Sequence, residues 1–330
     1  MVEHTLYNYL VYNVHYSCAN FTQEMLDDPK KGNVLFGTFF MFISFIYLCI
    51  ASLVLMAMLH ERHRSFNGFR IMAAIGVCDV VNLMVMGIYT GYLMSTGNVY
   101  CSNVLESYLV GCFCMAFYCL TCVLTVILAI NRCLAIAHPP TQEMLFNGYK
   151  TFIWIFCAVS YALYLFMFTN PIFFNAWGQC YFFNPYYGYN FKITDKYYNA
   201  SHYFTNLLVG FLLLIIYSIF AIFLIHQTKI KSKIAFKSTG DYTKSIFATV
   251  FLNSLLILAS SVGYLYVQYV SVPNWYYLVS STLAISVQGF NSIFYICFNN
   301  TIRETIAEYG ILNLKPKKFS TMIQVSTKIG

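Results

Sequence analysis

The longest uncharged run in this chain limits its fold more than any other feature. No Lys, Arg, Asp or Glu lies between Lys244 and Arg303. A helix needs about 20 apolar residues to cross the roughly 30 Å hydrocarbon core of a bilayer. The run is therefore too long for one crossing and suits two, divided by the turn at Val272-Pro273-Asn274. The sequence predicts a pair of membrane helices here.

Composition extends this prediction to the whole chain. Of its 330 residues 59% are hydrophobic and only 9% are charged, whereas about a quarter of a soluble domain is charged. We predict an all-α membrane protein, with a seven-helix domain at 33–298 between an outer segment at 1–32 and a tail at 299–330. The predicted spans lie near 33–60, 70–94, 104–136, 150–170, 199–228, 245–270 and 275–298.

The basic residues predict the orientation, because Lys and Arg near membrane spans collect on the cytoplasmic side. With the N-terminus outside, only four of the nineteen lie in outer segments: Lys30, Lys31, Lys192 and Lys196. An even number of spans would move the basic tail to the wrong side. We therefore expect the C-terminus inside. Asn20 and Asn199 begin Asn-X-Ser/Thr patterns in the predicted outer segments, which makes them candidate glycosylation sites.

Three of the twelve cysteines face the predicted outer, oxidising side: Cys18, Cys101 and Cys180. Cys101 begins the third span and Cys180 lies in the long loop at 171–198, so we predict a disulfide between them. Cys18 is then left free, able to exchange into that bond, or paired with another chain. The same loop is rich in Phe and Tyr, and we expect it to fold onto the bundle as a lid.

The residues after the seventh span predict one more helix. Phe298, Ile302, Ile306 and Tyr309 recur at helical spacing, opposite charged residues. This pattern is typical of an amphipathic helix on a membrane surface. We place it at about 299–309, against the inner leaflet.

Polar residues inside the spans are rare and costly. Asp79 lies in the middle of span two, with Asn82 one turn later on the same face. Two interpretations stay open for Asp79: an acid that holds helices together through hydrogen bonds, or a polar switch or cation site in the bundle interior.

Motifs at the ends of spans three and seven identify a family. Asn131-Arg132-Cys133, with Pro139 seven residues after the arginine, resembles the Asp-Arg-Tyr motif of rhodopsin-like G-protein-coupled receptors. Asn291-Ser292-Ile293-Phe294-Tyr295 resembles their Asn-Pro-x-x-Tyr motif. Within that superfamily the chain is similar to nematode serpentine chemoreceptors of class T. The matching residues, beside the Asn131-Arg132-Cys133 triplet, are Thr90-Gly91, Gly97, Tyr100-Cys101, Gly111, Leu145-Phe146, Gly148, Pro171 and Phe174-Asn175.

The resemblance implies a plasma-membrane receptor, in some cells ciliary, that detects small extracellular molecules and activates a heterotrimeric G protein. It assigns the activation switch to Asn131, Arg132, Cys133, Asn291 and Tyr295. It also places Asp79, Thr121 and Asn291 in a polar core able to hold a structural sodium ion. It implies no other cofactor and leaves dimerisation open.

Several residues depart from the family pattern. Asn131 replaces the acid that restrains the arginine at rest, which implies higher basal activity. Span six contains no proline, and Ser292 replaces the proline of span seven, so neither helix carries the usual cause of a kink.

The upper bundle predicts a site for a small and mostly neutral ligand. Cys114 stands where amine receptors have an acid, and span seven has no lysine to bind retinal. The candidate pocket residues are Cys114, Met115, Tyr118, Tyr264, Gln268 and Tyr276.

Other classes of protein fit less well. A transporter or channel is the main alternative, but we find no internal repeats or rings of polar residues. A rhodopsin-like receptor for another class of ligand is a second alternative. We expect no enzyme, since no metal-ligand cluster or nucleophile–base pair is evident. A nucleic-acid partner is not expected either, because the basic residues already face the lipid bilayer.

Overall fold

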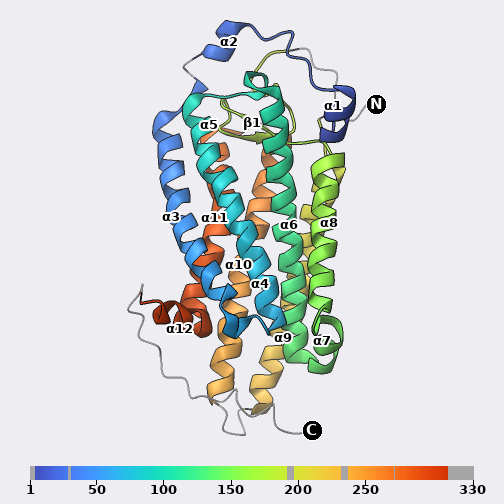
Figure 1. Ribbon diagram of the computed structural model, residues 1–330, viewed down its shortest axis with the longest axis vertical. Coiled ribbons are helices and arrows are strands. Elements are labelled where there is room, and N and C mark those ends of the chain that lie inside the picture. The colour runs from blue at the N-terminus through green and yellow to red at the C-terminus, as the bar shows by residue number, and fades with distance from the viewer. Residues whose placement is uncertain (1–3, 29–30, 192–196, 232–236, 271, 311–330) are drawn as a thin grey trace.

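The computed structural model describes residues 4–28, 31–191, 197–231, 237–270 and 272–310, and side chains at 224–250 are not part of this description. Residues 311–330 of the predicted tail lie outside it, as do Lys30, Lys192 and Lys196. Within the described part, seven helices are long and apolar enough to cross a membrane (Figure 1). Each corresponds to one predicted span, so the seven-helix bundle is confirmed.

The helices occur in the predicted order. They are α3 (Val34–Leu59), α4 (Asn67–Asn82) continued by η3 (Leu83–Tyr89) and α5 (Thr90–Thr96), α6 (Val104–Ala137), α8 (Lys150–Phe168), α9 (Ala200–Lys231), α10 (Lys237–Tyr269) and α11 (Asn274–Phe298). Pro273 precedes α11 directly, which explains why the long uncharged run divides there. α10 and α11 are each continuous helices, as the absence of proline predicted.

α6 is the centre of the bundle. In its most apolar window 78% of residues are buried, against 22% in α3 and in α8. Its first turn is fixed by Asn103, whose Oδ1 accepts a hydrogen bond from the Glu106 backbone N–H, and Glu106 adds a negative charge at the positive end of the helix. The helix packs against α4, α8 and α9.

Span two is not a uniform α-helix. Its middle, η3, has the wider π-helical turn, which changes the direction of the side chains that follow. After it, α5 packs closely on α3, where a Cβ at Gly37 would lie 2.5 Å from the Gly91 carbonyl oxygen. Small residues permit such close contact between membrane helices. The second half of span two therefore leans toward span one.

A lid covers one end of the bundle, which we call the lid end. Its centre is a hairpin of β1 (Phe173–Asn175) and β2 (Cys180–Phe182), in which Phe173 lies opposite Phe182. The segment at 4–28, with α1 (Leu6–Tyr12) and α2 (Gln23–Asp27), lies above this hairpin (Figure 1). Both strands are fully buried, so the prediction that this loop folds onto the bundle is confirmed.

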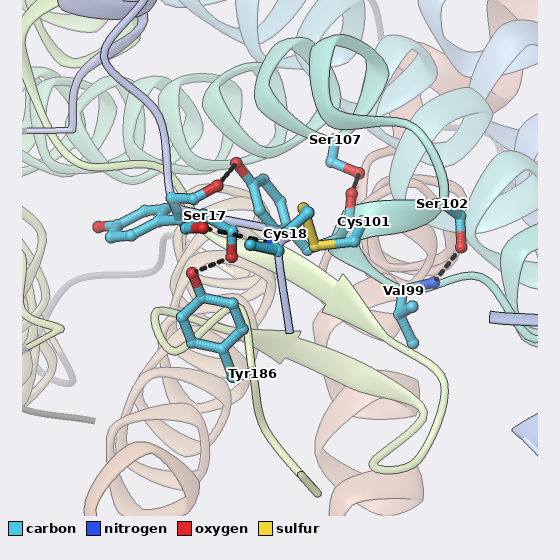
Figure 2. The surroundings of a disulfide bond; sticks show 10 residues. Ser17, Cys18, Val99, Cys101, Ser102, Ser107 and Tyr186 are labelled. Atoms are coloured by element: carbon cyan, nitrogen blue, oxygen red, sulfur yellow. Dashed lines mark hydrogen bonds between the residues drawn. A yellow bond between two sulfur atoms is a disulfide. The ribbon is translucent and has the colours of Figure 1, made fainter. Parts of the chain in front are cut away.

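The predicted disulfide between Cys101 and Cys180 is wrong: Cys101 is bonded to Cys18, with 5.8 Å between their Cα atoms. The Tyr100 hydroxyl donates to the Tyr16 carbonyl over 3.1 Å, which brings the N-terminal segment to η4 (Tyr100–Ser102). Figure 2 shows Tyr186 holding the same segment through the Ser17 carbonyl, at 2.7 Å. Cys180 pairs with Asn175 in the hairpin instead, and its free thiol is buried.

The opposite end, which we call the tail end, contains the short helices η2 (Glu61–His63), α7 (Pro139–Phe146) and α12 (Asn300–Glu308). Ile302 and Ile306 are buried on one face of α12, which confirms the predicted amphipathic helix. Asn299 begins it by accepting a hydrogen bond from the Ile302 backbone N–H.

The disulfide can be tested by peptide mapping without reduction. We expect Cys180→Ser to retain a cross-linked peptide containing Cys18 and Cys101, whereas Cys18→Ser should lose it and leave Cys101 open to alkylation. Losing a native disulfide typically costs about 2–4 kcal/mol, so Cys18→Ser should also unfold at a lower temperature. A cross-link between Cys101 and Cys180 in the native chain would contradict the assignment.

Candidate functional site

A cavity of about 40 Å³ lies between the lid and the bundle core, which is room for a few water molecules. Its polar lining consists of hydroxyls, thiols and one imidazole. The lining residues are Phe40, Met86, Thr90, Cys114, Met115, Tyr118, Ile172, Cys180, Tyr181, His202, Ser260, Tyr264, Ser280, Ser281 and Ala284. None of these carries a carboxylate, ammonium or guanidinium, so a charged molecule would find no counter-charge in the lining.

Four of the six predicted pocket residues line this cavity: Cys114, Met115, Tyr118 and Tyr264. The other two, Gln268 and Tyr276, do not line the cavity. Gln268 binds the lid backbone instead, and Tyr276 packs against Tyr266 and Trp275 with ring centroids 5.6 and 5.7 Å apart. Both lie near the lid end of their helices, where the hairpin occupies the space that they would otherwise face.

His202 is the main cavity residue that the sequence analysis missed. It is only 3% exposed and lies near the rings of Phe183 and Tyr264, each with its centroid 5.5 Å away. Asn206, one turn later, donates its side-chain amide to the His202 carbonyl over 2.9 Å. Two polar residues one helical turn apart in an apolar span indicate a helix face that points into the bundle, so the sequence could have predicted this position.

The predicted glycosylation site at Asn199 disagrees with the structure. Asn199 is 4% exposed, and its Nδ2 donates to the Asn170 carbonyl over 2.7 Å. Its Oδ1 accepts a hydrogen bond from the His202 backbone N–H, as a helix cap does. A glycan on Nδ2 would break these contacts. Asn20 is exposed and stays a predicted site.

Hydrogen bonds join the lid to α10 and α11. Gln268 on α10 accepts from the Phe183 backbone N–H over 3.1 Å and donates to the Tyr181 carbonyl over 3.0 Å. Ser281 on α11 donates to the Gln179 carbonyl over 2.8 Å. The two Gln268 bonds use the same side chain, so a shift of the lid strand changes both.

A second link to α10 lies at the cavity wall. The hydroxyls of Tyr118 on α6 and Ser261 on α10 are 2.9 Å apart and buried. Tyr118 lines the cavity, so a ligand there would contact one partner of this bond. A ligand bound in the cavity would therefore act directly on the contact between α6 and α10.

The predicted polar core is assembled below the cavity. Asn291 Nδ2 donates to Asp79 Oδ2 over 2.6 Å, while Thr121 accepts from Asn82 Nδ2 over 3.4 Å. Asp79 Oδ1 and Asn82 Oδ1 are buried without a hydrogen-bond partner in the described part of the chain. A carboxylate and an amide oxygen are ligands that a hard cation accepts, so these residues fit the sodium ion that the resemblance implies.

Arg132 lies at the tail end of α6, beside the start of span two. Its Nη2 is 2.9 Å from the Met72 sulfur, and a Cβ added to Gly68 would lie 2.9 Å from its Cζ. Among the described side chains no carboxylate forms an ion pair with it, because the one ion pair there joins Arg62 to Glu308. Among the other predicted switch residues, Asn131 and Tyr295 are buried and Cys133 is half-buried. Asn131 and Cys133 flank Arg132 on α6, and Tyr295 lies on α11. The guanidinium is held by packing.

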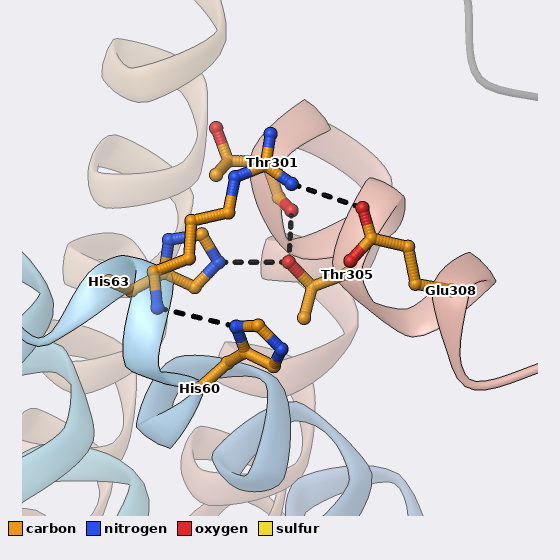
Figure 3. A network of polar contacts seen from close by, with 6 residues as sticks. His60, His63, Thr301, Thr305 and Glu308 are labelled. Carbon is orange, nitrogen blue, oxygen red and sulfur yellow. Dashed lines mark hydrogen bonds and ion pairs between the residues drawn. The ribbon is translucent and has the colours of Figure 1, made fainter.

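A polar network joins η2 to α12 at the tail end (Figure 3). His63 Nε2 lies 2.8 Å from Thr305 Oγ1, and Arg62 Nη1 lies 3.0 Å from Glu308 Oε1. Burial lowers the pKa of His63, as do the neighbouring Arg62 and His60, and Glu308 opposes them only in part. The network holds the amphipathic helix against the first loop.

Comparison with known proteins agrees with this geometry. A crystal structure of squid rhodopsin superposes on this chain with a TM-score of 0.66 and 14% sequence identity. The match covers 93% of this chain and 92% of the rhodopsin chain. The bundle therefore has the seven-helix fold of rhodopsin. The family described as serpentine type 7TM GPCR chemoreceptor Srt matches residues 1–319. The chain belongs to this family.

One curated relative is serpentine receptor class T-55 of Caenorhabditis elegans, which is 24% identical over 236 residues. The match covers 72% of this chain and 63% of the relative, so the chain spans less than two thirds of that protein. The resemblance to class T chemoreceptors is thus confirmed at the level of the family.

The depressed pKa of His63 predicts a pH dependence. Its neutral form is favoured when α12 is docked, so docking is fully stable above the ordinary histidine pKa of about 6.5 and weakens as the pH falls below it. We expect hydrogen exchange of α12, corrected for intrinsic rates, to speed up between about pH 7 and pH 5. His63→Gln should remove this dependence, whereas the control His60→Gln should retain it. A flat profile in the native chain would contradict the prediction.

Proposed function

We propose that this protein is a chemosensory receptor that binds small uncharged molecules in the lid-covered cavity and activates a heterotrimeric G protein. The observation that carries the proposal is an uncharged cavity whose wall and cover both bond to α10, through Tyr118 and Gln268. Membership of the Srt family supports the same function. A transporter is less well supported, because its substrate path would need to reach the tail end through the buried polar core.

The lid end is proposed to face outward, as the distribution of Lys and Arg predicts. A disulfide at that end, between Cys18 and Cys101, supports this orientation because disulfides persist on the oxidising side. The proposed location is the plasma membrane, with the sensory cilium as the site of exposure to external chemicals.

Activation would begin at α10. A ligand larger than the cavity that displaces Tyr118 or the lid acts on α10, because both are bonded to it, at Ser261 and Gln268. Because α10 contains no proline and is continuous from Lys237 to Tyr269, displacement at its lid end is transmitted along a stiff rod. The expected result is a shift of its tail end that opens a cleft for the G protein.

The polar core would act as the hinge of this movement. Asp79 and Asn291 join span two to span seven by one short hydrogen bond. A sodium ion held by Asp79 and Asn82 would neutralise the buried carboxylate and stabilise the resting bundle. Neither the ion nor dimerisation is needed for the activation step.

Arg132 supplies the first test. We expect Arg132→Ala to abolish G-protein activation in a cell-based ligand screen, and Asp79→Asn to weaken it by tenfold or more, a loss of about 1.4 kcal/mol of coupling. Both variants should reach the cell surface at native levels. Normal responses from both would refute the mechanism, and uptake of a labelled ligand into cells would favour a transporter.

Gly68 supplies a second test, because the resting arginine packs where a side chain would stand. Gly68→Ala places a methyl group 2.9 Å from the Arg132 Cζ position, and the flexible arginine must move away. We expect higher basal G-protein activity without loss of expression. The matched control is Gly263→Ala, because nothing lies within 4 Å of a Cβ there. Equal basal activity in the two variants would show that this packing does not restrain Arg132.

A further inference from the structure

Two further recesses lie beside the cavity and share lining residues with one another. The first, between span two, η4 and α6, includes Asn98, Ser102, Asn103, Glu106, Phe174 and Tyr181. The second is a groove on the membrane-facing side, where Val85, Leu105 and Leu109 are found. Tyr89, Asn103, Glu106 and Val110 line both recesses. The groove and the recess are therefore continuous along α6.

One side chain lines both this recess and the cavity. Tyr181 lines the recess and the cavity alike. Its hydroxyl lies 2.8 Å from Thr90 Oγ1 and 3.7 Å from the Cys114 sulfur. Groove, recess and cavity thus follow one another in a row, with the Tyr181 side chain as the barrier between the last two.

The hydrogen bonds of Tyr181 form a directed chain. Thr90 donates to the Val85 carbonyl over 3.0 Å, so its oxygen accepts the Tyr181 proton, and the Tyr181 oxygen in turn accepts from the Cys114 thiol. The chain therefore runs from α6 through the lid to the π-helical turn of span two. Rotation of the Tyr181 ring would break two hydrogen bonds, one of them the weak bond to sulfur, which is a modest cost.

The position of the groove follows from the path of span two. The π-helical turn at Leu83–Tyr89 redirects the chain, and α5 beyond it packs on α3 through Gly37 and Gly91. The second half of span two is thereby drawn toward span one and away from α6. The space left between them is the groove and recess.

The direct path from the lid end is closed. β1 and β2 are buried in full beneath the N-terminal segment, which the disulfide at Cys101 and the Tyr186 hydrogen bond hold in place (Figure 2). Leu6, Tyr16 and Phe173 fill the layer between them. A molecule entering from above would have to displace this whole layer, whereas from the side it meets one ring.

We propose that ligands reach the cavity sideways, from the outer leaflet, through the gap between η3–α5 and α6, with Tyr181 as the gate. The inference rests on the proposed function and names its ligand class: small, uncharged and lipophilic molecules that partition into the membrane. Leu105 and Leu109, 43% and 41% exposed, form the apolar side of the entrance. The carboxylate of Glu106, half-buried beside Asn103 at 2.7 Å, disfavours anions there.

The test uses Cys114 as a reporter inside the cavity, and so requires neither the natural ligand nor a G protein. The receptor, in lipid nanodiscs, is treated with N-ethylmaleimide, which is neutral and lipid-soluble, or with a charged trimethylammonium methanethiosulfonate. Modification of Cys114 is followed over time by peptide mass spectrometry. Cys157, exposed on α8, reports how much reagent reaches the membrane face.

We expect the neutral reagent to modify Cys114 at a rate that scales with its modification of Cys157, and the charged reagent to modify Cys114 at least tenfold more slowly than the neutral one. Val110→Trp, which narrows the entrance, should slow the neutral reagent about tenfold, equivalent to roughly 1.4 kcal/mol in the barrier. Tyr181→Phe should speed up modification of Cys114 by the neutral reagent, and Tyr181→Ala should speed it up further. Leu163→Trp, on the membrane-facing side of α8, is the matched control and should change nothing.

Two results would overturn the proposal. One is an unchanged rate at Cys114 in Val110→Trp, with native thermal stability. The other is equal reaction with both reagents, which indicates a water-filled path from above. Because the readout is chemical, a receptor that failed to couple to any G protein would still give a clear answer about the entrance.

Discussion

The structure depends on the absence of water from the bilayer core. Every backbone N–H and C=O in a span must find its partner within the protein, so each crossing is a helix. The same constraint acts on side chains. Asp79, Asn291 and Thr121 are tolerated within the spans because they form hydrogen bonds inside the bundle. Polar groups therefore gather at a few depths instead of being spread along the helices.

Those depths divide the bundle into two levels that α10 spans. At the upper level Gln268 and Ser261 bind the lid and α6. At the lower level Arg132 packs against Gly68 and lies within hydrogen-bond distance of the Met72 sulfur, both on span two. Among the described side chains Arg132 has no ion pair, so packing and one contact to sulfur are what a movement there must break. A small movement of the helices can thus release the arginine, in keeping with the asparagine at position 131.

Features that depend on one stretch of chain could be predicted from the sequence, and features that depend on meetings between distant stretches could not. Apolar length predicted the seven spans and helical spacing predicted α12, whereas the joining of Asp79 to Asn291 was predicted only through the resemblance to rhodopsin-like receptors. The bond from Cys101 to Cys18 required knowing that Tyr100 holds the N-terminal segment. The burial of His202 and Asn199 was missed because the start of α9 lies deeper under the lid than hydropathy alone suggests.

The disulfide has a consequence for the lid itself. A bond from Cys101 to Cys180 would anchor the hairpin covalently to η4, but the bond to Cys18 anchors the N-terminal segment above it. The hairpin is held by hydrogen bonds instead, among them those to Thr90, Gln268 and Ser281, each on a different span. Each such bond contributes only about 1 kcal/mol net. A ligand that contacts the hairpin can therefore exchange these bonds one at a time, and the choice of bond determines which helix moves.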